Sequence, residues 1–183
     1  MEYWHWQEWG MKIRNLMNEP KDQDIYELKR LFSSLDEETA ENYGRFNTND
    51  LRFGAETIVE RIIGDKNEIG LIGMDDEHYY LGPPIGYAHI YLSEKESRRH
   101  SAGFGIVIHQ DYQGQGYGEQ LIKEAIKTAK RWKVKKIWLH VYSFNKPAIG
   151  LYKKMGFKRE GVFRKEEYKK GRFVDVISMA KWI

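Results

Sequence analysis

The chain of 183 residues is 41% hydrophobic and 31% charged, which is typical of one globular domain and excludes a disordered chain. Its formal net charge of +3 combines 12 basic and 20 acidic residues at 1–100 with 18 basic and 7 acidic residues at 101–183, which indicates either two electrostatic tasks or two solvated faces. The absence of cysteine excludes disulfides, thiolate nucleophiles and cysteine metal sites, and agrees with the cytoplasm as the expected compartment.

The N-terminal segment 1–10 contains three tryptophans but no basic start followed by an apolar core, so a secretory signal is not expected there. We expect this segment to be a tryptophan-rich extension that packs on the domain or forms a contact in a possible homodimer. Residues 11–183 are expected to form a single domain. Because no apolar run approaches the roughly 20 residues of a transmembrane helix, no membrane contact is expected.

The first part of this domain is predicted to contain one strand and three helices. Apolar residues recur at helical spacing after residues 22 and 50. Between these segments, Ser34 and Glu37 have the spacing of a capping box, which predicts that Ser34 caps a short helix. The predicted elements are a strand at 12–16 and helices at 22–32, 34–44 and 50–63.

Strands dominate the pattern from residue 68 onward. The segments 85–92 and 101–108 are rich in β-branched and aromatic residues and are predicted to pair as an antiparallel hairpin. In the segment 136–142, successive side chains are expected to point to opposite faces of a strand, which places Ile137, Leu139 and Val141 together on one face. The other predicted elements are a strand at 68–74, a glycine-rich turn at 113–118 that leads into an amphipathic helix, a helix capped by Ser143 or Asn145 and ended by Gly156, and a hairpin of 159–168 with 172–182. Together these elements predict one mixed α+β domain.

The glycine-rich turn 113–118 is the first candidate for a ligand site. Glycines before a helix let a ligand approach the free N–H groups, and a phosphate or pyrophosphate is the expected occupant. The dinucleotide-binding fingerprint fails because Glu119 stands where a third glycine is needed, and the Gly-Lys-Ser/Thr of the nucleotide triphosphatases is absent. A turn required only for tight strand–helix packing is the alternative.

Two blocks of this sequence resemble the signatures of the GNAT family of N-acetyltransferases. The Gln-x-x-Gly-x-Gly motif at 113–118 is similar to the family's coenzyme A signature, and the segments 139–145 and 151–157 are similar to its second signature. The resemblance covers residues 85–183 well. It implies a three-layer α+β fold whose central mixed, mostly antiparallel sheet has about six to seven strands, a V-shaped splay between two parallel central strands, and about four to five flanking helices.

The same resemblance implies that acetyl-CoA is the cosubstrate. The strand before the turn would pair its main chain with the pantetheine arm, and the amides of the turn would hold the pyrophosphate with help from the helix dipole. Asn145 matches a position that contacts the cofactor arm, although an asparagine at this point also suits a helix N-cap. The implied cofactor-binding residues are Ile106, Val107, Ile108, Gln113, Gly114, Gln115, Gly116, Tyr117, Gly118, Glu119 and Asn145.

For the reaction, the resemblance implies direct acetyl transfer to a primary amine within a ternary complex, with a main-chain N–H near Ile108 holding the oxyanion. Tyr152 matches the tyrosine that gives a proton to the departing thiolate, and packing on its helix is the alternative role. His140 stands where some relatives have a glutamate base, and the ordinary histidine pKa of about 6.5 suits that role. Tyr142, Ser143, or an acidic residue of the N-terminal part acting through water, are further candidates for the base.

No motif identifies the acceptor amine. An acidic group at 36–41 can attract a cationic amine such as an amino acid, a polyamine or a protein N-terminus, or simply form an exposed helix start. The alternatives from other classes are a non-catalytic CoA-binding module and a nucleic-acid-binding domain. We do not expect nucleic acid as a partner, because Val134 interrupts the lysines at 133–136. No metal is expected, because the histidines lack paired zinc spacing.

Overall fold

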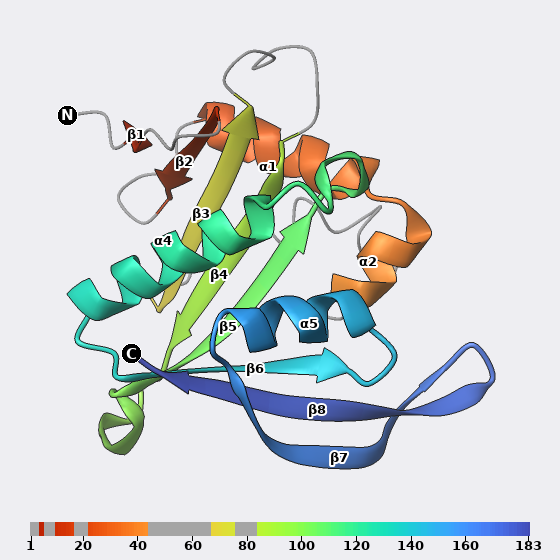
Figure 1. The fold of residues 1–183 in the computed structure, drawn as a ribbon. Coiled ribbons are helices and arrows are strands. Elements are labelled where there is room, and N and C mark those ends of the chain that lie inside the picture. The colour runs from red at the N-terminus through yellow and green to blue at the C-terminus, as the bar shows by residue number, and fades with distance from the viewer. Residues whose placement is uncertain (1–3, 6–9, 17–21, 44–66, 76–83) are drawn as a thin grey trace.

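The computed structural model describes residues 4–5, 10–16, 22–43, 67–75 and 84–183, which form an eight-stranded sheet with helices on both faces (Figure 1). The strand order is β1-β2-β3-β4-β5-β6-β8-β7, and β5 with β6 is the parallel pair among the described strands. This arrangement confirms the expected α+β class and the mixed, mostly antiparallel sheet. The elements are β1 (Trp4–His5), β2 (Met11–Asn15), α1 (Asp22–Ser34), α2 (Glu37–Tyr43), β3 (Glu68–Asp75), β4 (Gly86–Leu92), β5 (Ser101–Ile108), α4 (Tyr117–Arg131), β6 (Lys136–Tyr142), α5 (Lys146–Lys154), β7 (Lys158–Lys169) and β8 (Arg172–Trp182).

Two apolar cores lie on opposite faces of the sheet. On one face, Leu28 and Phe32 of α1 pack with Val107 of β5. On the other face, α4 crosses β3, β4 and β5 (Figure 1), and Ile106 and Ile108 pack against its core cluster. Because successive residues of a strand point to opposite faces, both cores meet at the carboxyl end of β5. That end is therefore held firmly from both sides.

Several sequence predictions are confirmed closely, and one is wrong. The observed β5 and β6 match the predicted segments 101–108 and 136–142, and β4 with β5 forms the expected antiparallel hairpin. The predicted Ser34 cap is wrong, because Asp36 Oδ1 accepts the N–H of Thr39 at 2.7 Å and thus caps α2. Ser34 instead ends α1 and donates its hydroxyl to the carbonyl of Leu31.

Two predictions fall outside the part of the chain that the structure describes. The helix expected at 50–63 lies there entirely, and most of the tryptophan-rich segment 1–10 does too. The extension, its dimer contact and the domain boundary at residue 11 therefore stay predictions. Within the described ranges, none of the helices has the length and apolar character needed to cross a bilayer.

The two central parallel strands separate after a short contact. β5 and β6 share three residue pairs, from Ser101 with Lys136 to Gly103 with Trp138. Both strands then continue, β5 beside β4 and β6 beside β8, with no further pairing to one another among the described residues. The expected V-shaped splay is confirmed, and its mouth lies beyond Gly103.

The long C-terminal hairpin reaches back to the N-terminal part of the fold. β7 and β8 meet in a tight turn at Lys170 and Gly171, which both have positive φ angles. Lys170 Nζ lies 2.9 Å from a carboxylate oxygen of Glu41 and 3.3 Å from one of Glu37, both on α2. This ion pair joins the hairpin tip to α2 across one end of the splay.

Candidate active site

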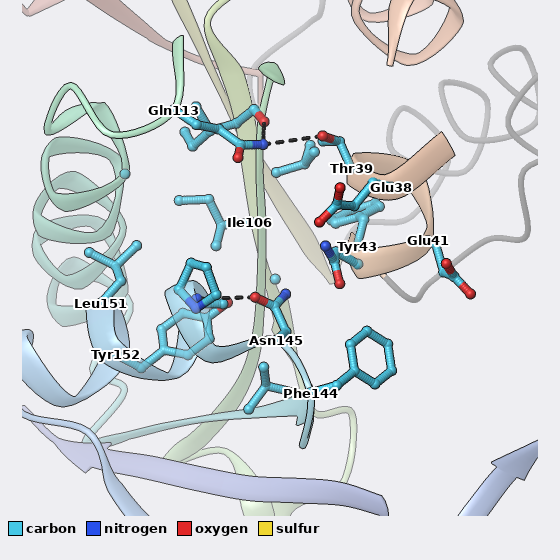
Figure 2. A pocket seen from close by; sticks show the side chains of 18 of the residues that line it. Glu38, Thr39, Glu41, Tyr43, Ile106, Gln113, Phe144, Asn145, Leu151 and Tyr152 are labelled. Atoms are coloured by element: carbon cyan, nitrogen blue, oxygen red, sulfur yellow. Dashed lines mark hydrogen bonds between the residues drawn. The ribbon is translucent and has the colours of Figure 1, made fainter. Parts of the chain in front are cut away.

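The splay holds a cleft of about 690 Å³. Its walls come from α2, the second half of β5, the glycine turn, α5 and the tip of the β7–β8 hairpin (Figure 2). Of the sequence-predicted residues, eleven are part of the described lining. Gln115, Tyr117 and the alternative bases Tyr142 and Ser143 are not. Those eleven are Ile106, Val107, Ile108, Gln113, Gly114, Gly116, Gly118, Glu119, His140, Asn145 and Tyr152.

The three glycines of the turn are needed for different physical reasons. Gly114 and Gly116 have φ angles of +75° and +89°, which side-chain-bearing residues rarely adopt, and a Cβ on either would meet no atom within 4 Å. These two positions therefore keep an open, ligand-accessible backbone. Gly118 instead serves packing, because a Cβ there would come within 2.9 Å of Leu151 Cδ2 on α5. The packing alternative is thus right for one glycine of the three.

The amides of the turn are available to an anion. Within the described chain, the N–H groups of residues 114–118 have no hydrogen-bond acceptor, and they stand at the start of α4, where the helix dipole is positive. The Glu119 amide differs, because it donates to the carbonyl of Gly116 at 3.0 Å. The Glu119 side chain forms an ion pair with Lys154 of α5. Five of the six predicted amides thus suit a phosphate-binding role.

Two glutamines hold the turn to the rest of the site. Gln113 Nε2 donates to the carbonyl of Ile108 at 3.1 Å and to Thr39 Oγ1 of α2 at 3.2 Å. Gln110, which sequence reasoning missed, donates to the carbonyl of Ser34 at 2.9 Å and accepts the N–H of Asp36 at 3.1 Å. The side chain of Gln113 therefore positions the turn and α2. No local pattern signals the Gln110 contacts, because its partners lie more than 70 residues away in sequence.

Asn145 and Tyr152 belong to α5. Asn145 Oδ1 accepts the N–H of Ala148 at 3.1 Å, which confirms the N-cap interpretation. Tyr152 is 6% exposed, borders the cleft, and contacts the ring of Phe157 with centroids 5.8 Å apart. Its burial raises the pKa of the phenol above the ordinary value of 10. Tyr152 therefore stays protonated at neutral pH and can donate a hydrogen bond into the cleft.

His140 borders the cleft but is held by an aromatic cluster. Its ring lies 5.2 Å from Trp138 and 5.2 Å from Phe163, between centroids. Desolvation by this packing lowers the pKa of His140, against an opposing effect of Glu166. Tyr142, another candidate base, donates its hydroxyl to Glu167 at 2.8 Å, and burial together with that carboxylate raises the pKa of the phenol. Tyr142 is therefore not an evident proton acceptor, whereas His140, whose lowered pKa leaves the imidazole neutral at neutral pH, stays a predicted candidate for the base.

The end of the cleft next to α2 carries charges of both signs. Glu38 and Glu41 line it from α2, and Lys170 and Arg172 line it from the hairpin tip. Arg172 lies over the ring of Phe144, with its guanidinium carbon 5.7 Å from the centroid. The contacts of Lys170 raise its pKa, first through Glu41 and then through Glu37. The sequence signalled the acidic residues but not the basic tip, which reaches this place only through tertiary structure.

The described residues contain no group of three or more histidine and acidic side chains placed to hold a metal ion. The chemistry that this cleft can perform must be argued from its main-chain donors, its buried phenol and the polar side chains of α2.

Comparisons with known proteins agree with this geometry. The family model described as Acetyltransferase (GNAT) family matches residues 24–157. The L-amino acid N-acetyltransferase AaaT of Escherichia coli is 35% identical over 101 residues, which cover 55% of this chain and 62% of that protein. The chain thus spans less than two thirds of this relative.

Solved structures share the whole fold. An acetyltransferase of the GNAT family from Streptococcus pneumoniae has a TM-score of 0.75 at 26% identity, covering 94% of this chain and 99% of that one. A spermidine N-acetyltransferase from Vibrio cholerae, solved in complex with CoA and spermine, has a TM-score of 0.72 at 24% identity, covering 94% and 95%. At this identity the second likeness concerns the fold. Since the family model covers most of the sequence and the cleft has the expected splay, the chain belongs to the GNAT acetyltransferase family.

Proposed function

We propose that this protein is an N-acetyltransferase that moves the acetyl group of acetyl-CoA to a primary amine. The observation that carries the proposal is the opening of the sheet beyond Gly103, with an anion-accepting glycine turn at its edge. Family membership and the named N-acetyltransferase relatives support the same reaction class.

The cofactor would occupy the gap in place of the missing strand pairs. Main-chain groups of residues 106–108 would pair with the pantetheine arm, and the N–H groups of residues 114–118 would hold the pyrophosphate. Asn145 would contact the arm with its side-chain amide nitrogen, because its Oδ1 already caps α5. Gln113 would act indirectly, since its amide fixes the turn against Ile108 and Thr39.

Acetyl transfer would proceed by direct attack. The amine lone pair forms the new N–C bond to the thioester carbonyl, and the C–S bond then breaks with its electron pair leaving on sulfur. A main-chain N–H near Ile108 would hold the oxyanion that develops between these steps. An acyl-cysteine intermediate is excluded because the sequence contains no cysteine. Holding both reactants in one cleft would supply much of the acceleration through proximity.

Tyr152 would stabilise the leaving sulfur. Because burial raises the pKa of this phenol, it lies above the value of about 8.5 for an ordinary thiol. Complete proton transfer to a free thiolate is therefore uphill. A hydrogen bond from the protonated phenol to the developing thiolate is favourable, and the proton can follow as the product leaves. This refines the expectation that Tyr152 simply gives up its proton.

The acceptor would be a primary amine of a small molecule, an amino acid or polyamine, or a protein N-terminus. The relatives named above act on L-amino acids and on spermidine, according to their names. In this chain, Glu38 of α2 lines the cleft and can offer its carboxylate to a cationic amine, whereas the carboxylate of Glu41 is paired with Lys170. Amino acids, polyamines and peptide N-termini are the classes to compare.

The experiment has a binding arm and a turnover arm. Thermal melting and calorimetry with acetyl-CoA measure cofactor binding, since a ligand of the folded state raises its stability. A thiol reagent then measures CoA release with L-amino acids, spermidine and a peptide with a free N-terminus. Binding together with release by at least one amine is the expected result. Binding without release would favour a CoA-binding module, and absence of binding by correctly folded protein would refute the proposal.

A nucleic-acid-binding domain makes a different prediction. It would bind DNA or RNA with an affinity that falls steeply as salt is added, and it would ignore acetyl-CoA.

A further inference from the structure

We infer that Tyr43 and His89 form the proton-accepting pair for the acceptor amine, with Tyr43 touching the nitrogen and His89 receiving the proton through it. This inference rests on the proposed acetyl transfer and deepens it. A protonated amine cannot attack a thioester, so the site needs a group that removes this proton. Tyr142 is engaged as a donor to Glu167, and His140, which packs between Trp138 and Phe163, is the rival candidate for this role.

Tyr43 connects the cleft to a buried histidine. It is the last residue of α2 and lines the cleft, and its hydroxyl lies 3.1 Å from His89 Nδ1. The two rings meet edge to face, with centroids 6.1 Å apart and an angle of 86° between their planes. His89 is 8% exposed. A phenol in this position can donate its proton to the unprotonated Nδ1, and the side chain that carries it lines the cleft.

The backbone of β5 makes room for His89. The strand pairing places His89 opposite Gly105, and a Cβ at Gly105 would lie only 2.2 Å from His89 Cε1. The imidazole thus extends over the strand that borders the cleft, one residue before the segment 106–108 proposed to hold the cofactor arm. Any side chain at residue 105 would displace the ring.

Other contacts fix the orientation of the imidazole. Tyr87 of the same strand stacks on it, with centroids 5.9 Å apart and ring planes 24° apart, and the Tyr87 hydroxyl donates to Glu68 of β3 at 3.3 Å. In the described part of the chain, the titratable groups around His89 are therefore Tyr43 from α2, Tyr87 from its own strand and Glu68 from β3. Imidazole is the side chain whose ordinary pKa is nearest to neutral, so it suits a proton acceptor at physiological pH.

Tyr43 and Tyr152, two of the tyrosines that line the cleft, lie on opposite walls. Figure 2 shows Tyr43 on the α2 side and Tyr152 on the α5 side, with Ile106 of β5 between them. This separation suits acyl transfer, because the attacking nitrogen and the departing sulfur can then each meet a different phenol. Tyr152 would thus serve the sulfur, and Tyr43 the nitrogen.

Asn42 gives a second, independent sign that an N–H donor belongs beside Tyr43. Its Oδ1 atom is buried, and among the described residues it has no hydrogen-bond partner. Asn42 lines the same cleft. A buried acceptor without a donor is costly, and an amine nitrogen held between Asn42 and Tyr43 would satisfy it.

The proton transfer balances without any further reactant. One N–H bond of the attacking nitrogen breaks, and its proton goes to the Tyr43 oxygen. The original Tyr43 proton passes to His89 Nδ1, so the phenol is restored and the imidazole becomes an imidazolium. The nitrogen keeps its electron pair for the N–C bond. His89 returns its proton to solvent after the acetylated product has left.

The test compares Tyr43→Phe and His89→Gln with matched controls outside the cleft, Tyr91→Phe and His100→Gln. With the fastest amine of the panel, Tyr43→Phe should lower kcat/KM by about 100-fold or more at neutral pH, as expected for loss of a general base. His89→Gln should lower it less and should remove the near-neutral limb of the pH profile. Both variants should bind acetyl-CoA with unchanged Kd, and both controls should keep full activity.

A rescue experiment separates proton transfer from mere packing. For Tyr43→Phe, the rate should recover as pH rises or when an acceptor of lower amine pKa is used, because the amine then loses its proton without help. An unchanged kcat/KM and pH profile in both Tyr43→Phe and His89→Gln would overturn the inference. A loss of activity that neither pH nor a less basic amine restores would also overturn it. No CoA release by the unmodified protein with any amine would instead refute the proposed function, and this inference with it.

Discussion

Replacement of Gly116 by alanine tests the proposed pyrophosphate site directly. Gly116 has a φ angle of +89° and immediately precedes α4. This left-handed conformation costs an L-residue about 1–2 kcal/mol. A Cβ at this position would meet no atom within 4 Å, so the variant has room to fold. For a domain of this size, that cost corresponds to a melting temperature lower by roughly 2–8 °C.

Cofactor binding should suffer in addition to stability. The new methyl group would stand in the open space before the free amides, and the Kd for acetyl-CoA should rise at least about tenfold, or ~1.4 kcal/mol. Gly10→Ala is the matched control, because Gly10 has a φ of +72°, equally open surroundings, and no place in the cleft lining. Melting curves and calorimetric titration measure both quantities. If Gly116→Ala melts like Gly10→Ala and still binds acetyl-CoA with the original Kd, the site is wrong.

Three further changes test the catalytic, capping and electrostatic arguments. Tyr152→Phe should lower kcat by about 10- to 100-fold, the value of one hydrogen bond to a charged group, with an unchanged Kd for acetyl-CoA; equal kcat values would reject its role at the sulfur. Asp36→Ala removes the acceptor of the Thr39 amide and should lower the unfolding free energy by about 1 kcal/mol in urea titrations, whereas an unaltered midpoint would contradict the observed cap. The Lys165 amide, followed by the Arg164 guanidinium, holds the pKa of Asp175 below its usual 3.8, so the folded-state pKa is lower than the unfolded one and the carboxylate stabilises the fold above that pH. The melting temperature of Asp175→Asn should therefore lie below that of the unmodified protein at neutral pH and converge with it in acid, and a constant difference would argue against this linkage.

Elements with strong local patterns could be predicted from the sequence. The alternation in β6, the β-branched run of β5 and the glycine turn place one wall of the cleft correctly, because strand faces and glycine conformations follow from neighbouring residues. The Ser34 cap failed for a local reason as well, since Asp36 lies closer to the first turn of α2 and its carboxylate accepts the amide better.

The other wall depends on contacts between remote segments. Lys170 reaches Glu41 from 129 residues further along the chain, and no periodicity signals that approach. The pairing of His89 with Gly105 has a recoverable signal, because counting residues through the predicted hairpin places them opposite one another. The sequence does not indicate that Tyr43 of α2 contacts this imidazole, which is the contact on which the proposed proton transfer depends. The chemistry of the acceptor side is thus a tertiary property.

The brief contact between β5 and β6 has a mechanical consequence. Within the described chain, the two halves of the sheet are joined only by the short β5–β6 pairing of residues 101–103 with 136–138. Few backbone hydrogen bonds therefore hold the middle of the sheet together without a ligand. An extended molecule bound along residues 104–108 would occupy the gap between β5 and β6 like an additional strand and would connect the two halves of the sheet. Substrate occupancy and the rigidity of the whole sheet are then coupled, and slower amide hydrogen exchange in both β5 and β6 is the signature of a loaded enzyme.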